Sequence, residues 1–237
     1  MTAQGGIHRS ACGYRQAPLP LTSMYNPDPF RVDDPAVLQD FIGRHPLGTL
    51  VALADNEFIA NHIPMIWRSR AGTPGVLQGH VAKANPLWEL LRSGAAVLVI
   101  FHGAEHYLSP GLYPESSVAD GKILPTWNYS VVHVHGEMRF HDSSDAALNN
   151  VTALAQQYER TYSQPWTVPD APANYVEPLL NRVVAFEISI SRMIGKFKAS
   201  QQRPEAERAF VARSLAGEGA SPAEVAELIR PPQERGK

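Results

Sequence analysis

The chain has 237 residues, which is enough for one large domain or two small ones with a sizeable buried core. Its composition, 44% hydrophobic and 19% charged, is typical of a globular protein rather than a disordered one. Its 21 Lys and Arg residues are balanced by 23 Asp and Glu residues, so the basic excess of a dedicated DNA-binding domain is missing.

The single cysteine, the longest apolar stretch and the N-terminal segment exclude further classes of protein. Cys12 alone excludes an intramolecular disulfide framework and a cysteine-based zinc finger, and it favours a reducing cytoplasm. The longest apolar stretch, 95–101, is too short to span a membrane. Residues 1–23 lack a signal-peptide core and any periodicity, so we expect a disordered tail there, with organised sequence from Met24 onward.

The first half of the chain predicts a helix followed by three neighbouring strands. Asp34 as cap and Pro35 as first helical residue predict a helix over 34–46. Short turns then separate three strands, which indicates antiparallel pairing because parallel strands need longer connections. The predicted strands cover 47–54, 57–69 and 76–83.

A second helix is predicted over 85–94, capped by Asn85 and ended by Gly94. The continuously apolar stretch 95–101 then predicts a strand that is covered on both faces. A loop over 103–125 should follow it.

The second half predicts two more strands and four helices. In the stretch up to residue 140, Val132, Val134, Met138 and Phe140 alternate with His133, His135, Glu137 and Arg139, which predicts a strand with one polar face. The remaining predicted elements are helices at 143–158 and 172–180, a strand at 183–193, and helices at 203–217 and 221–230. About six mostly antiparallel strands with helices at the margins predict an α+β, barrel-like domain.

Three stretches are candidates for chemistry. His133 and His135 point to one face of their strand, where they could share a metal or simply face water. Lys83 precedes the N-terminus of the predicted helix 85–94, a position that attracts phosphate, and the alternative is a solvated lysine beside an ordinary cap. The segment 195–203 groups Lys196, Lys198 and Arg203 in what is either an anion-binding turn or a polar loop.

Four segments together, 24–30, 79–86, 124–136 and 195–204, resemble the PaiB-like family of FMN-binding transcriptional regulators. The resemblance extends over residues 24–215, with residues 216–237 as a C-terminal helical extension. It implies an antiparallel FMN-binding split β-barrel with peripheral helices, similar to the pyridoxamine-oxidase-like barrels, and a homodimer that holds FMN at its interface.

The resemblance also implies cofactor-binding residues. Lys83, with His80 beside it, matches the position that takes the FMN phosphate, and Asn61 and His62 match the strand edge along the flavin. The family's other marked positions correspond to Asn128, Lys198, Ser200 and Gln201, which the partner subunit could supply. Phe197 departs from the pattern, which expects tryptophan there.

The implied function is that of a cytoplasmic, PaiB-type negative transcriptional regulator. The alternatives are a flavin-dependent oxidoreductase acting on a small molecule and a haem-binding barrel. Since no basic recognition element is present, we do not expect direct DNA binding.

Overall fold

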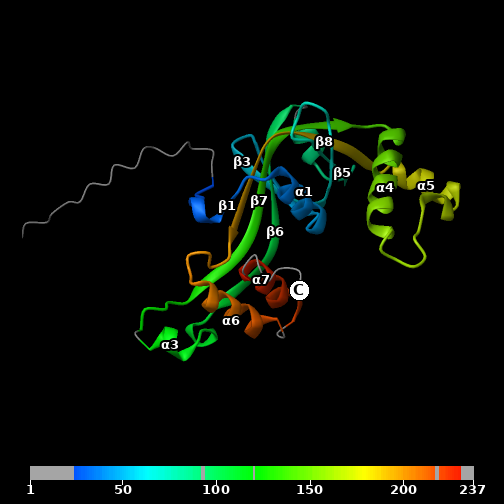
Figure 1. Cartoon of the computed structure of the whole chain (residues 1–237). Coiled ribbons are helices and arrows are strands. Elements are labelled where there is room, and N and C mark those ends of the chain that lie inside the picture. Colours follow the sequence, from blue (N-terminus) through cyan, green and yellow to red (C-terminus); the bar gives the residue numbers. More distant parts are fainter. Residues whose placement is uncertain (1–23, 92–93, 120, 217–218, 231–237) are drawn as a thin grey trace, which may run out of the picture.

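The computed structural model of the chain describes residues 24–91, 94–119, 121–216 and 219–230, so the predicted disordered tail at 1–23 lies outside the described residues. In Figure 1 long strands run through the molecule, with helices near both of their ends and beside their middle. The strands are β1 (Arg31–Val32), β2 (Leu47–Ala54), β3 (Glu57–Pro64), β4 (Ile66–Arg68), β5 (Val76–Ala82), β6 (Ala95–Leu108), β7 (Thr126–His141) and β8 (Val183–Lys198). The α-helices are α1 (Pro35–Arg44), α2 (Leu87–Leu90), α3 (Glu115–Val118), α4 (Ser144–Glu159), α5 (Ala173–Leu180), α6 (Glu205–Leu215) and α7 (Ala220–Ile229). Short 3-10 helices are η1 (Asp28–Phe30), η2 (Pro110–Leu112) and η3 (Val168–Asp170).

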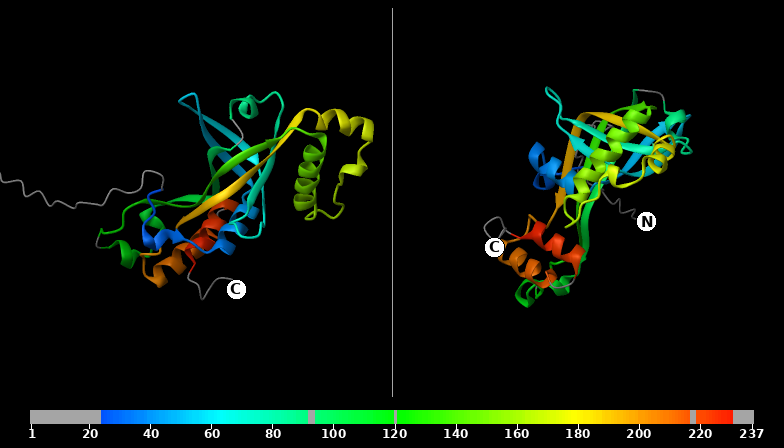
Figure 2. Two further views of the ribbon diagram at one scale, coloured as in Figure 1. Left: turned by 90° about the horizontal axis from the view of Figure 1, so that it is seen from above. Right: turned by 90° about the vertical axis from the view of Figure 1, so that its right-hand side faces the viewer.

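All eight strands belong to one antiparallel sheet in the order β3-β2-β6-β7-β8-β5-β4, and β1 adds to β8. The sheet coils until β3 also contacts β5, which leaves a partly closed barrel. Helices lie outside it, as Figures 1 and 2 show. The predicted α+β fold, an antiparallel split barrel with peripheral helices, is therefore confirmed.

The barrel encloses the main hydrophobic core because one face of each strand is apolar. Val97, Val99 and Phe101 of β6 are buried within it, and Leu38 and Phe41 of α1 pack against the same cluster. The helix begins as predicted, since the Asp34 carboxylate accepts a hydrogen bond of 2.8 Å from the Ala36 N–H. This core fixes which face of every strand points outward.

A second cluster lies at the far end of β6 and β7. There α6 and α7 pack on Leu108 and Tyr113 through Val211, Leu215 and Ile229. The predicted domain boundary at residue 215 therefore falls between two helices that pack on each other. None of the helices in the described part of the chain has both the length and the apolar character that a membrane span requires.

Two predicted elements differ from the structure at the corner of the barrel. The strand predicted over 57–69 is two strands, because the chain leaves β2 after Pro64 and β4 pairs with β5 instead. Met65 donates its N–H to the Pro46 carbonyl (2.9 Å) at this corner. The helix predicted over 85–94 is a single turn, α2, and so offers far less of a helix terminus than expected.

Two strands are longer than predicted because their outer ends are polar. β6 continues to Leu108, through the first residues of the predicted loop 103–125. β8 continues to Lys198, so the predicted basic turn 195–203 begins inside a strand. Periodicity in apolar residues marks only the core-facing part of a strand, and pairing with β7 extends both elements beyond it.

Substitution of Gly136 tests the tight pairing of β7 and β8. A Cβ there would collide with the Ser189 carbonyl and would lie 2.7 Å from Ile188 Cγ2. We expect Gly136→Ala to lower the free energy of unfolding by about 1–3 kcal/mol. Gly43→Ala is the control, because its Cβ would meet nothing within 4 Å in α1 and should stabilise the helix by up to about 1 kcal/mol. Urea denaturation of both variants measures the difference, and equal effects would contradict this packing.

Candidate functional site

Lys83 follows β5 at one end of the sheet. Its backbone N–H donates to the Arg182 carbonyl (2.7 Å), and its own carbonyl accepts from the Trp88 indole (2.9 Å). Its ammonium pairs with the Asp142 carboxylate at 2.7 Å, and both side chains are more than 40% exposed. An exposed pair of this kind contributes little to stability, so the lysine remains available to another anion.

The anion site that Lys83 can serve differs from the predicted one. The N-terminus of α2 is partly satisfied already, since the Asn85 side chain accepts from the Leu87 N–H (3.0 Å). A polar cavity of about 130 Å³ instead joins Lys83 to the start of α4, and its other polar members are Asp142, Ser143, Ser144 and Asn181. α4 has 16 residues, with Ser143 as its N-cap. The Ser144 hydroxyl donates to the Asn181 side-chain oxygen (2.8 Å), whereas an ammonium, the Ser143 hydroxyl and the start of a long helix fit a phosphate group.

Asn61 and His62 lie on opposite faces of β3, as successive strand residues must. The Asn61 carbonyl oxygen accepts from the Asn85 amide (2.8 Å), which connects β3 to the loop that follows Lys83. His62 lies on the outer face, where its Nδ1 is 3.0 Å from the Thr49 hydroxyl. Asn61 therefore belongs with Lys83, whereas His62 belongs to the open face of the sheet.

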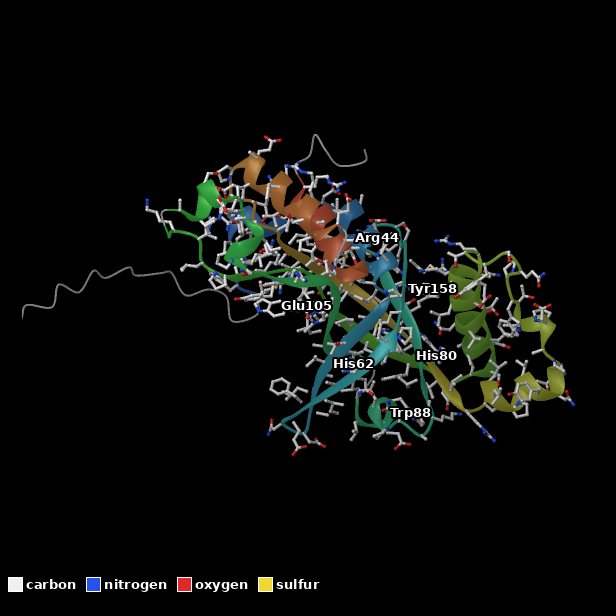
Figure 3. All side chains as sticks on the ribbon, turned by 90° about the horizontal axis from the view of Figure 1, so that it is seen from below. Arg44, His62, His80, Trp88, Glu105 and Tyr158 are labelled. Carbon is white, nitrogen blue, oxygen red and sulfur yellow. The ribbon has the colours of Figure 1, made fainter. Side chains whose placement is uncertain are left out.

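His80 is turned toward α4. Its Nδ1 is 2.7 Å from the Asn150 side-chain oxygen, and Figure 3 shows it on the side of the sheet next to that helix. A polar cavity of about 210 Å³ adjoins Asn150 there and is lined by Gln78, Glu187 and His141 among others. In this arrangement His80 anchors α4, and its role beside Lys83 stays a prediction.

The second group of predicted residues surrounds the turn after β8, which we call the Lys198 turn (residues 198–203). The Lys198 ammonium donates to the Thr126 hydroxyl (2.6 Å) and to the Trp127 carbonyl (2.8 Å). Asn128 and Ser200 are buried and hydrogen-bonded to each other, with the Asn128 amide 3.0 Å from the Ser200 hydroxyl. Ser200 has a φ of 59°, so this pair holds a sharp turn in the left-handed region.

Gln201 completes the same turn. Its carbonyl oxygen accepts from the Ala199 N–H (2.8 Å), and its amide donates to the Phe197 carbonyl. The side chains of Asn128, Ser200 and Gln201 thus satisfy one another and the local backbone. They shape the turn and leave Lys198 at its surface, while their own contact with a cofactor stays a prediction.

The two groups lie at opposite ends of β8. Lys83 bonds to Arg182, just before the strand begins, and Lys198 is its last residue. A strand of 16 residues is about 50 Å long when straight. The structure therefore brings Asn61 and Lys83 together, and Asn128, Lys198, Ser200 and Gln201 together, but does not bring the two groups together within one chain.

His133 and His135 lie on the outer face of β7, as predicted. Burial lowers the pKa of His133, and the nearby His135, His102 and Lys196 lower it further. Burial and then Arg192 lower the pKa of His135. Among the described residues, no group of three or more His, Cys, Asp or Glu side chains is placed to hold a metal ion.

The sequence analysis missed Asp142, Ser143 and Ser144 as neighbours of Lys83. One local signal could have indicated these residues. Ser143 precedes a periodic helix and is a typical N-cap, so its hydroxyl and the first N–H groups of the helix lie next to the preceding loop. Nothing local showed that Lys83 would meet this loop, because residues 83 and 142 come together only through the pairing of β5, β8 and β7.

Comparisons with known proteins bear on the family and the fold of the chain. The family profile described as "Putative FMN-binding domain" matches residues 24–192. A protein of Emericella nidulans is 33% identical over 208 residues, which cover 73% of this chain and 82% of that relative. Protease synthase and sporulation protein PAI 2 of Bacillus subtilis is 28% identical over 195 residues, covering 82% and 90%. A crystal structure of a conserved hypothetical protein of Mycobacterium tuberculosis shares the fold, with a TM-score of 0.52, 14% identity, and coverage of 76% and 94%.

The depressed pKa of His133 predicts acid sensitivity. Its usual value is 6.5, and the folded state lowers it, so the unfolded chain binds more protons as the pH falls below about 6.5. The free energy of unfolding should therefore decrease from pH 7.5 to pH 5.5, and less steeply in His133→Gln. Urea denaturation at the two pH values measures this, with His141→Gln, at the exposed end of β7, as control. Identical slopes in wild type and His133→Gln would contradict the prediction.

Proposed function

The chain belongs to the FMN-binding domain family, and from this premise we propose a homodimer that holds each FMN between residues of both subunits. The cofactor of the family is FMN, so the chain is a flavin-binding protein. When bound, FMN supplies electron or hydride transfer. Which residues hold it and how the subunits meet are the subjects of the proposal.

The observation that carries the proposal is the separation of the two groups of polar residues. Lys83 and Asn61 at one end of β8, and the Lys198 turn at the other, each offer only part of a flavin site. A two-fold axis perpendicular to β8 brings one end of a subunit to the opposite end of its partner, because residue i of one copy then meets residue j of the other and residue j meets residue i. One copy would then supply the Lys83 group and the other the Lys198 turn.

The outer face of the sheet supports self-association. The strand β6 is apolar on both faces, but only one face is buried. Leu98 and Ile100, on the other face, alternate with the buried residues and are partly exposed. Nearby, Leu53 is 55% exposed and Phe58 is 82% exposed, and these two residues are paired across β2 and β3. A second copy would cover this apolar surface.

Within each site we assign the phosphate to Lys83. The ammonium, the Ser143 hydroxyl and the first turn of α4 would hold the dianion, and Asp142 would release the ammonium as the phosphate arrives. Lys198 would bring a second positive charge from the partner. Its ammonium is already held by Thr126 and Trp127, so it needs no reorganisation to act.

For the biological role, we propose a PaiB-type negative regulator that acts through a partner or a metabolite. The relationship to PAI 2 of Bacillus subtilis supports this assignment. A flavin-dependent oxidoreductase acting on a small molecule is the second candidate. It is favoured by the exposed rings of Tyr107 and Trp127, 5.9 Å apart, which offer an aromatic surface close to Lys198.

Mixed dimers test the shared site. Lys83→Ala and Lys198→Ala should each weaken FMN binding about ten- to a hundredfold in homodimers, since each removes a charge-assisted hydrogen bond. In a mixed dimer of the two variants, one site has both lysines and the other has neither. Fluorescence titration of doubly tagged, co-purified mixed dimers should therefore find one FMN bound with wild-type affinity per dimer.

Lys122→Ala is the matched control, because this exposed lysine lies outside both groups. If the mixed dimers had no site of native affinity, the two lysines of each FMN site would come from the same subunit, which would contradict the proposal. Sedimentation showing only monomers would refute the dimer itself.

The charge of the chain predicts weak DNA binding. With a formal charge of −2, it lacks the basic surface that contacts to many phosphates require. Lys196 is also buried and donates to the Tyr25 carbonyl (2.9 Å), which removes one member of the basic segment from the surface. We expect no sequence-specific binding at nanomolar protein in an anisotropy titration with the upstream region at about 150 mM salt. Tight binding that scrambled DNA abolishes would contradict this expectation.

A further inference from the structure

Helices α4 and α5, with η3 between them, enclose an apolar groove that neither polar group uses. Its cavity has a volume of about 460 Å³, and a second cavity of about 180 Å³ adjoins it. Figure 2 shows these helices as a hairpin beside the sheet. The side chains that line both cavities are those of Val168, Ala171, Val176 and Leu180. We call this space the α4–α5 groove.

The groove exists because the hairpin does not fill its own interior. α5 contains no buried residue, although Val176, Leu179 and Leu180 are apolar. On α4, Leu148 lines the groove and is 37% exposed. Folded proteins normally leave few voids larger than a water molecule. A cavity of about 460 Å³ with apolar walls lies instead in the size range of sites for small molecules.

The polar side chains at the larger cavity select the charge of its occupant. Glu177 is the one ionisable residue among those that line it, and no Lys, Arg or His side chain lines either cavity. Among the described residues, Glu177 forms no ion pair. A carboxylic acid in the groove would meet this charge without compensation, whereas a protonated amine would pair with it.

We propose that the α4–α5 groove binds a small apolar molecule that carries a protonated amine. The apolar body lies among Val168, Val176 and Leu180, and the ammonium pairs with Glu177 at the rim. The site does not depend on FMN. It adjoins the phosphate cavity all the same, because Leu180 lines that cavity together with Lys83.

Titration of the FMN-loaded, full-length protein with three probes of equal chain length tests the proposal. Isothermal calorimetry should find one n-octylamine bound per chain. 1-Octanol should bind roughly fivefold more weakly because it lacks the ion pair, and octanoate more weakly still. Binding of a probe should change the tryptophan fluorescence of the protein, because Trp166 lines the smaller cavity. Most of this change should be lost in Trp166→Phe.

Two variants separate charge from shape. Glu177→Gln should remove the preference for the amine over the alcohol, whereas Glu115→Gln, which removes an exposed carboxylate of α3 outside the groove, should keep it. Ala171→Trp should fill the groove and abolish binding of all three probes. Because Glu177 is exposed, its variant keeps the fold even if Ala171→Trp does not.

Three results would overturn the proposal. They are no binding of n-octylamine to the wild type, equal affinity for the amine and the acid, or an unchanged preference in Glu177→Gln. A different pair of results would assign the groove to a second copy of the chain. In that case no probe would bind to the wild type, and sedimentation would show that Ala171→Trp converts a dimer to monomers.

Discussion

The continuous pairing of β7 with β8 is the constraint on which the rest of the molecule depends. Both strands have 16 residues, and the pairs between them run from Tyr129 with Lys198 to His141 with Ala185. β8 also pairs with β5 along its first half and with β1 near its end. The cofactor residues proposed on or next to β5, β7 and β8 are therefore positioned by β8 directly or through one neighbouring strand, whereas Asn61 lies on β3 at one edge of the sheet.

This long strand pair is also the reason why we propose a flavin site divided between two subunits. The hydrogen bonds between β7 and β8 keep β8 extended. Lys83 and Lys198, at the two ends of this strand, therefore stay apart whatever the conformation of the loops. The same ladder leaves a broad outer face on which Leu98 and Ile100 lie near His133 and His102. Dimerisation would solve both problems, since it completes the site and covers the apolar side chains.

Local sequence signals succeeded where one residue or one period carries the information. Asp34 acts as the predicted cap, and the alternation after Val131 assigns His133 and His135 to the outer face. Local signals failed where a residue distant in the sequence determines how a strand pairs or where a helix ends. Pro64 does not by itself show that the chain changes partner from β2 to β5, and the cap at Asn85 does not show that α2 lasts a single turn.

The sequence by itself determined the antiparallel barrel, its longer helices and most of its strands and, through its resemblance, the FMN-binding family and the residues to examine. Periodicity and caps encode these features locally. Only the tertiary structure decided that Asn128 and Ser200 are buried against each other, that His80 anchors α4, and that Lys83 meets the start of α4. These contacts join residues far apart in the chain, and their partners follow from strand register and barrel closure, which no local pattern specifies.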